Sequence, residues 1–471
     1  MILENGVVRT MEPSLPVARA LAIAGELVAG GVGTHEVALP SPERVDLGGR
    51  CVLPGFNDAH VHFPWSGEWN PPVEPTKEAL DRVTGDTPAA LMAKDYHSLW
   101  LNSAGLARAN GQLQVPGGVV EVDERGEPTG VLREKCAWHF RDSFAAPSDE
   151  ESVDAMREGL RVAVSRGVTA VHDKDGWRGA LRFWQRLAGE GALTLRVWQS
   201  VPHEQVSELA ALGLRSGFGD PMLRIGYLKA FMDGTLGSQT ARMLDGSGVE
   251  ITGREALEDV VRRGAAAGFP VAVHAIGDLA NREALDAFEA TQEVWAPIGL
   301  RPRIEHAQLL TPEDLPRFAR LGVAASVQFS HAPSDRDLAD RFWAGKTDGA
   351  YAYRSLLESG AVVANGSDAP IEELDPWAGV CAGVLRTIDE RPAWHSEQTV
   401  TLEQALEATT VAPAWLAGDE RRRGKLVPGF LADLVVLDRD PFECEAKELR
   451  EVQVVATMVG GRWVYNPPPW D

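Results

Sequence analysis

The chain has 471 residues, of which 44% are hydrophobic and 24% charged; this composition is typical of a globular protein and excludes disordered and fibrous classes. Its formal net charge of -22 disfavours nucleic acid and anionic membranes as partners, because both are themselves negative. Four scattered cysteines without metal-ligand spacing, and no recognisable secretory signal or bilayer-length apolar run, favour a reduced cytoplasmic protein.

The two ends of the chain have the pattern of short strands separated by turns. Gly6–Thr10 and Ala20–Ala24 are apolar runs near the start, and Asp433–Asp438 is a similar run near the end. Neither end could bury a core alone. We therefore expect residues 1–50 and 420–471 to form one small composite β-sandwich.

Between these ends, in residues 51–419, β-rich apolar runs alternate with helical patterns such as Ser152–Arg166. Alternation of this kind predicts βαβ units and a parallel sheet. Eight runs are predicted as strands: Cys51–Phe56, Val168–His172, Leu195–Gln199, Arg224–Phe231, Pro270–His274, Arg303–His306, Val323–Gln328 and Val362–Ser367. Eight such strands with helices between them predict an α/β fold, a (β/α)8 TIM-type barrel.

Residues 64–150 interrupt this alternation. They separate the first two predicted strands by far more chain than a simple connection needs. The segment is rich in Pro, Gly and Trp. We interpret it as a subdomain inserted over the mouth of the barrel.

The pair His60 and His62 directly follows the first predicted strand. Residues i and i+2 of extended backbone point the same way, so both imidazoles could bind one metal ion. A chance HxH is quite possible in a chain with 11 histidines. The pair therefore needs support from other parts of the sequence.

That support comes from other polar residues in or after later predicted strands: Lys229, His274, His306 and Asp368. Each has an ordinary structural explanation, such as a hydrogen-bonded histidine, a helix-capping aspartate or a lysine extending from the barrel wall. Catalytic residues of such barrels gather at the carboxyl ends of the strands. The joint pattern in strand order therefore favours a metal site.

Longer motifs point to a family. They are Asn5-Gly6, Thr10-Met11-Glu12-Pro13, Leu53-Pro54-Gly55-Phe56, Asp95–Ser103, Lys229–Gly234, His274–Asp278, Glu305-His306-Ala307 and Pro428–Leu437. With these motifs, which span nearly the whole chain, the protein resembles the amidohydrolase superfamily. Within it, the protein is most similar to the family-3 branch of YtcJ-like proteins, which includes N-substituted formamide deformylases.

The resemblance implies two divalent metal ions, with zinc as the default and manganese, iron or cobalt as alternatives. The implied ligands are His60, His62 and Asp368 for the first ion, His274 and His306 for the second, and carboxylated Lys229 as a bridge between them. A lysine near metal ions and apolar walls should have a lowered pKa, and its neutral amine can react with carbon dioxide. Without this modification, the site is expected to hold one ion.

The implied activity is hydrolysis of a non-peptide C–N (amide) bond by a metal-activated hydroxide. Asp368 would take a proton from the nucleophile and deliver it to the departing amine. An N-substituted formamide or N-acyl amine is the leading substrate. A cyclic amide, carbamate or ester on the same site, or a non-catalytic metal-binding regulatory protein, are the alternatives. A glycosidase barrel would need a second carboxylate beside Glu305 and would leave the histidines unexplained.

Three further residues are predicted to contact a small-molecule substrate. His97 and Trp100 lie in the insertion, and His172 ends the second predicted strand. The alternative for His97 is a packing role within the insertion. We expect Asp173–Asp175 to form a solvated loop. The remaining histidines, including His331, match no ligand position. A homodimer is plausible for a barrel of this size.

Overall fold

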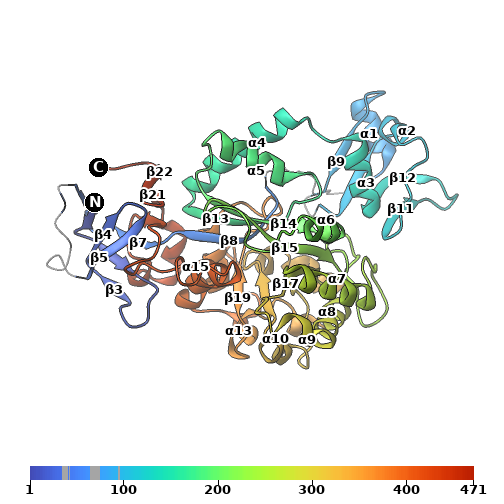
Figure 1. Ribbon diagram of the computed structural model, residues 1–471. Helices are drawn as coiled ribbons and strands as arrows, with labels where there is room; N and C mark the ends of the chain where they lie inside the picture. The colour runs from blue at the N-terminus through green and yellow to red at the C-terminus, as the bar shows by residue number, and fades with distance from the viewer. Residues whose placement is uncertain (34–40, 42, 64–74, 94–95, 471) are drawn as a thin grey trace.

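The computed structural model describes residues 1–33, 41, 43–63, 75–93 and 96–470, and its central element is an eight-stranded parallel sheet (Figure 1). The strands are β8 (Phe56–Val61), β13 (Val168–Asp173), β14 (Arg196–Pro202), β15 (Leu223–Phe231), β16 (Val271–Ala275), β17 (Arg303–His306), β18 (Ala324–Val327) and β19 (Val363–Asn365). Past the end of β19, the Asp368 amide donates to His60 O at 2.7 Å, and the His62 amide donates to Ala369 O at 2.8 Å. These bonds join the first and last strands, so the predicted (β/α)8 barrel is confirmed.

The first barrel strand begins later than the sequence pattern predicts. Cys51–Pro54 forms β7, which pairs with β2 (Val7–Arg9) and β20 (Leu434–Leu437) in a sheet of the chain ends. The barrel strand β8 begins at Phe56, after Gly55. The prediction of Cys51–Phe56 as a barrel strand was therefore wrong, because one apolar run spans the end of one sheet and the start of another.

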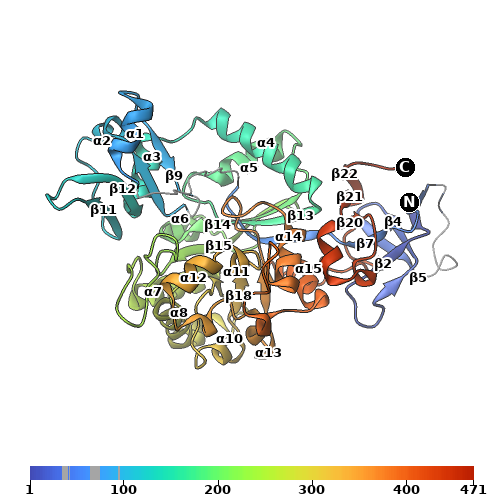
Figure 2. The ribbon, with the colours of Figure 1, turned by 180° about the vertical axis from the view of Figure 1, so that it is seen from behind.

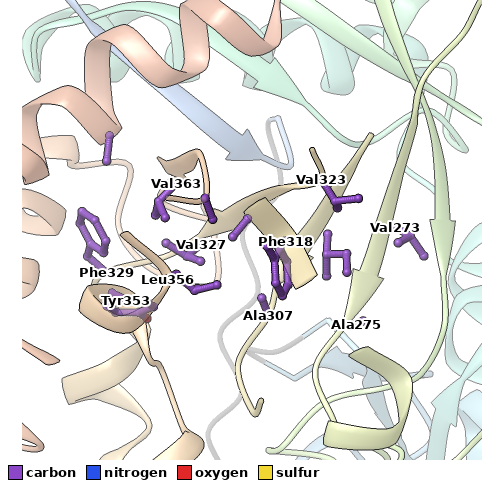
Figure 3. Close-up of a cluster of buried hydrophobic side chains, with 14 of the residues drawn as sticks. Val273, Ala275, Ala307, Phe318, Val323, Val327, Phe329, Tyr353, Leu356 and Val363 are labelled. Atoms are coloured by element: carbon purple, nitrogen blue, oxygen red, sulfur yellow. The ribbon is translucent and has the colours of Figure 1, made fainter. Parts of the chain in front are cut away.

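Helices cover the outside of the barrel (Figures 1 and 2). They are α4 (Asp149–Ser165), α5 (Ala180–Gly189), α6 (Val206–Ala211), α7 (Arg254–Ala267), α8 (Asp278–Ala290), α9 (Gln292–Trp295), α10 (Leu315–Leu321), α11 (His331–Ser334), α12 (Arg336–Phe342), α13 (Tyr353–Glu358), α14 (Pro376–Leu385) and α15 (Leu402–Leu416). Figure 3 shows Phe318 of α10 and Leu356 of α13 beside Val327 and Val363, and all four belong to one buried cluster. Within the described ranges, no helix combines the length and apolar character that crossing a membrane requires.

Both chain ends build the small β-sandwich that the sequence predicts. One sheet has the order β5-β4-β1-β6, and the other has the order β22-β21-β20-β7-β2-β3. The strands not yet given are β1 (Ile2–Glu4), β3 (Val17–Ala18), β4 (Ala20–Ala24), β5 (Leu27–Gly33), β6 (Arg44–Asp46), β21 (Val454–Val459) and β22 (Arg462–Tyr465). Leu21 and Val45 of the first sheet share a buried core with Val52, Leu434 and Met458 of the second.

The segment between β8 and α4 contains a separate unit at the end of the molecule opposite the termini (Figures 1 and 2). It consists of α1 (Lys77–Thr84), β9 (Ala90–Met92), β10 (Ser98–Leu101), α2 (Ser103–Arg108), β11 (Gly118–Val122), β12 (Pro128–Glu134) and α3 (Lys135–Phe144). Its sheet has the order β11-β12-β10-β9, and Leu99, Leu132 and Phe140 belong to its own buried core. Residues 64–74 and 94–95 of the predicted insertion lie outside the described residues.

Gly55 joins the terminal sandwich to the barrel at a point without room for a side chain. A methyl group there would lie 2.1 Å from Thr169 Cγ2 and 2.4 Å from Thr169 Oγ1. Because threonine is β-branched and stiff, we expect Gly55→Ala to lower the free energy of unfolding by about 1–3 kcal/mol. Urea denaturation measures this change. Gly30→Ala is the control, because nothing lies within 4 Å of the added methyl; equal losses in both variants would contradict the steric explanation.

Candidate metal centre

His60, His62 and Asp368 converge where the barrel closes. His60 and His62 lie at the end of β8, where alternate residues point the same way, and Asp368 follows β19. The two Nε2 atoms are 3.3 Å apart. Asp368 Oδ1 lies 3.3 Å from His60 Nε2 and 3.4 Å from His62 Nε2. Three ligand atoms of the kind that zinc prefers therefore face one another.

The other predicted metal-site residues come from neighbouring strands. His274 lies in β16, His306 ends β17, and Lys229 lies in β15. The ring centroid of His306 is 4.6 Å from that of His274 and 4.8 Å from that of His60. Lys229 is buried, and its Nζ lies 4.5 Å from the ring centroid of Phe231. The structure therefore brings all six residues to the carboxyl end of the barrel.

Among the residues that the structure describes, two groups of side chains are compact enough to hold a metal ion, with ligand atoms within 4.8 Å of one another. These groups are His60–His62–Asp368 and His306–His331–Asp368. His274 belongs to neither group. Its Nε2 donates to the Gly234 carbonyl at 3.1 Å, which leaves Nδ1 as its potential ligand atom.

The protonation states of these side chains suit a divalent cation. Burial lowers the pKa of His60 to about 3 and that of His306 to about 4, although Asp368 acts in the opposite direction. The pKa of Asp368 lies well below its usual range, because His60, His62 and His306 together outweigh the cost of burial. Metal binding needs neutral imidazole and ionised carboxylate, and both are present at neutral pH.

The environment of Lys229 makes its neutral amine more populated than that of an ordinary lysine. Burial lowers its pKa to about 8, although Glu305 and Asp368 partly oppose this change. Its Nζ has no hydrogen-bond partner within the described part of the chain. A buried polar atom without a partner is uncommon, and ligand binding or modification is one explanation for it. The environment of Lys229 is therefore compatible with the expected carboxylation.

A cavity of about 800 Å³ opens beside these residues. His62, Lys229, His274, His306 and Asp368 contribute to its wall. A large cavity with a few convergent polar groups is typical of a small-molecule site.

One wall of this cavity is aromatic. The ring centroid of Phe231 lies 5.1 Å from that of Trp138 and 5.4 Å from that of Trp177. All three side chains line the cavity, as do Leu236 and Ile251. The site therefore combines an apolar wall with the cluster of metal-binding side chains.

Comparison with known proteins places this site in a family. A sequence model of the amidohydrolase family matches residues 67–465. The chain belongs to the amidohydrolase family. It is therefore a hydrolase of the metal-dependent amidohydrolase superfamily, and the resemblance predicted from its motifs is confirmed.

Similar amidohydrolases cover nearly the whole chain. YtcJ of Bacillus subtilis (strain 168), which is named as an amidohydrolase, is 29% identical over 502 residues, covering 93% of this chain and 94% of its own. N-substituted formamide deformylase of Arthrobacter pascens is 26% identical over 531 residues, which cover 98% of this chain and 97% of the relative. The crystal structure of an uncharacterised metal-dependent hydrolase from Pyrococcus horikoshii OT3 matches with a TM-score of 0.78 and 28% identity. The match covers 95% of this chain and 99% of that structure.

In this amidohydrolase, His97 reaches the cavity from the insertion, but Trp100 and His172 are not among the described residues that line it. The ring centroid of His97 lies 5.2 Å from that of His274, and His97 Nδ1 donates to Glu134 Oε2 at 2.6 Å. Trp100 points to the other face of the strand, because it lies an odd number of residues from His97. Its Nε1 donates to the Thr76 carbonyl.

His172 is fully buried inside the barrel, below the cavity. Its Nδ1 lies 3.4 Å from Arg303 Nη1, and its ring centroid is 6.3 Å from that of Trp198. His172 therefore lies deeper in the barrel than the predicted contact with a substrate requires. Lys174, two residues further on, lies on the same side of the strand and nearer the metal-binding side chains.

Sequence reasoning named Glu305 but did not identify it as a buried carboxylate in contact with the predicted metal ligand His60. Glu305 Oε2 lies 2.8 Å from His60 Nδ1, and Glu305 Oε1 lies 2.9 Å from Arg303 Nε and 3.1 Å from Lys174 Nζ. All four side chains are fully buried. The expected solvated loop at Asp173–Asp175 was wrong, because Lys174 is the buried counter-ion of Glu305.

The contact from Glu305 orients His60, which is a predicted metal ligand. Because Glu305 accepts the Nδ1 proton of His60, the lone pair of His60 is on Nε2, which faces His62 and Asp368. Two non-glycine residues of the site also have positive φ angles, His306 at 73° and Asp368 at 58°. Such angles are strained for ordinary residues and concentrate at functional sites.

Proposed function

We propose that this amidohydrolase hydrolyses the C–N bond of a linear amide, an N-substituted formamide or N-acyl amine. The observation that carries this proposal is the position of Asp368, whose Oδ1 lies 3.3 and 3.4 Å from the Nε2 atoms of His60 and His62 and which lines the cavity. The name of the Arthrobacter pascens relative, N-substituted formamide deformylase, supports this substrate class. The aromatic wall of the cavity offers a surface for an apolar substituent on the amide nitrogen.

We propose His60, His62 and Asp368 as ligands of one metal ion, zinc by default. Lys229, carboxylated on Nζ, would join His274 and His306 at a second ion and bridge both. A bound divalent ion would lower the pKa of a water molecule and polarise the amide carbonyl. The carbamate would supply two oxygen ligands and a negative charge, which reduces repulsion between the two cations.

Asp368 would move the proton that the reaction requires. Its ionised carboxylate can accept a proton from the attacking water and return it to the departing nitrogen. This transfer matters because an amide nitrogen leaves as an amine only after protonation. The hydrogen bond from the Asp368 amide to His60 O holds the main chain of Asp368 beside that of His60.

The test is a substrate panel with the purified full chain, supplied in turn with zinc, manganese, cobalt and iron(II). We expect release of free amine from N-alkyl and N-aryl formamides or the matched acetamides, measured with an amine-reactive dye. Turnover only of lactams, carbamates or esters would replace the linear amide by one of these substrates. Metal binding without turnover of any compound would favour a non-catalytic protein instead.

The bridging role of Lys229 gives a separate prediction. We expect Lys229→Ala to lower the metal content from about two ions per chain to about one, because the second ion loses its anionic ligand. Elemental analysis of protein purified without chelators measures this. Lys447→Ala, which removes an exposed lysine that pairs only at 3.9 Å with Glu445, should retain the wild-type content. One equivalent in both wild type and Lys229→Ala would remove the bridge.

A further inference from the structure

His331 is a buried histidine of the cavity that the proposed mechanism does not use. It is the first residue of α11, lines the cavity and is 5% exposed. Its ring is stacked on that of His306, with centroids 6.2 Å apart and an interplanar angle of 7°. Its Nε2 has no hydrogen-bond partner among the residues that the structure describes. A buried nitrogen atom in that state is uncommon, and a ligand or water molecule in the cavity would supply its partner.

The neighbour of the other ring nitrogen determines which role fits. Gln308 Nε2 lies 3.1 Å from His331 Nδ1. In this orientation of the Gln308 amide, its NH₂ group donates and His331 Nδ1 accepts, so a neutral imidazole carries its proton on Nε2. A metal ligand would need a lone pair at Nε2. This tautomer therefore makes His331 Nε2 a hydrogen-bond donor rather than a metal ligand.

The nitrogen atom Nε2 of His331 lies beside Asp368 in the wall of the cavity. His331 Nε2 lies 3.7 Å from Asp368 Oδ2, which is too far for a direct hydrogen bond. Asp368 is the residue through which the proposed proton transfer runs. A substrate oxygen close to both residues would be within reach of the Nε2–H group.

We propose that His331 Nε2–H donates a hydrogen bond to the carbonyl oxygen of the substrate, an assignment that rests on the proposed amide hydrolysis. Attack of the water oxygen forms a C–O bond, and the carbonyl π electrons move onto the carbonyl oxygen. When the C=O bond re-forms, the C–N bond breaks and the nitrogen takes the proton from Asp368. The His331 donor is strongest while the oxygen carries negative charge, so it stabilises the transition state more than the bound substrate.

Two variants of His331 separate donation from packing. His331→Phe keeps an aromatic ring against His306 but removes the donor, and His331→Gln supplies an amide donor instead. We expect His331→Phe to lower kcat about 100- to 1000-fold with little change in KM. His331→Gln should recover part of this loss. Both should retain the wild-type metal content, as should the control His139→Phe, whose residue lies outside the cavity lining.

A binding measurement tests the donor without relying on turnover. Acetate, a carboxylate like the product of amide hydrolysis, is titrated into the cobalt-loaded protein and followed by visible absorption. We expect His331→Phe to raise the acetate dissociation constant about tenfold, the size of one charge-assisted hydrogen bond. If no amide is hydrolysed but this rise occurs, the proposed substrate is wrong and the donor stands. Loss of a metal equivalent in both His331 variants, or unchanged kcat and acetate affinity, would overturn the donor assignment.

Discussion

Replacing Asp368 by asparagine is expected to lower kcat by roughly 10³- to 10⁴-fold. Asparagine keeps the shape of the side chain and tolerates the left-handed backbone of this position, where φ is 58°. It cannot accept and return a proton as a carboxylate does. It also removes the negative charge that lies 3.3 and 3.4 Å from His60 and His62, so metal affinity should fall as well.

The two effects of Asp368→Asn separate when the variant is assayed over increasing metal concentration. Full metal loading with kcat still at least a thousandfold below wild type would isolate the proton transfer. Asp348→Asn is the matched control, because Asp348 is exposed, lies in a short 3-10 helix and is not among the described residues that line the cavity. A fully loaded Asp368→Asn variant that retained a tenth of wild-type kcat would exclude Asp368 as the proton carrier.

The second large effect is on stability. We expect Glu305→Gln to lower the free energy of unfolding by about 3–5 kcal/mol, because it leaves two buried cations, Lys174 and Arg303, without their counter-ion. Burial alone would raise the pKa of Glu305, but Arg303 and His60 lower it well below its usual range. The carboxylate is thus fully charged at neutral pH. The same variant should bind metal about 10- to 100-fold more weakly, because His60 loses its anionic partner.

Urea denaturation and metal titration of Glu305→Gln measure these two effects. Glu397→Gln is a close control, because Glu397 also lies 2.8 Å from a histidine Nδ1, that of His395, but is exposed. An exposed pair of this kind contributes less than about 1 kcal/mol. Equal stability of Glu305→Gln and wild type would contradict this prediction, because it would mean that other groups in the barrel compensate the charges of Arg303 and Lys174.

Much of the fold follows from local patterns in the sequence. Seven of the eight predicted strands overlap their observed barrel strands over most or all of the shorter range, because apolar β-branched runs alternate with amphipathic helices. The eighth, Cys51–Phe56, shares only its last residue with β8. The run does not reveal that the chain passes from one sheet to another at Gly55. Only pairing with residues hundreds of positions away, such as Val435 opposite Leu53, distinguishes the two strands.

The candidate site could be predicted in part, for a similar reason. His60, His62, His274 and His306 occur at strand ends, where position alone indicates convergence. His331 follows β18 by four residues, and the same reasoning would have found it had the loops after the strands been included. Lys174 was interpreted as solvated because its neighbours are charged. Its burial depends on Glu305, which lies more than a hundred residues away.

The insertion has a consequence for how such a protein can acquire new substrates. Its sheet pairs with no described barrel strand and its apolar core is its own, yet it delivers His97 and Trp138 to the cavity. The insertion is thus a separately packed subdomain that lines part of the cavity. It is held to the barrel by contacts such as the hydrogen bonds of Glu134 with Ser238 and Thr240. Replacement of this subdomain would change which molecules fit into the cavity, while the polar side chains at the carboxyl ends of the barrel strands stay in place. Substrate preference can therefore change in evolution without loss of the residues proposed for catalysis.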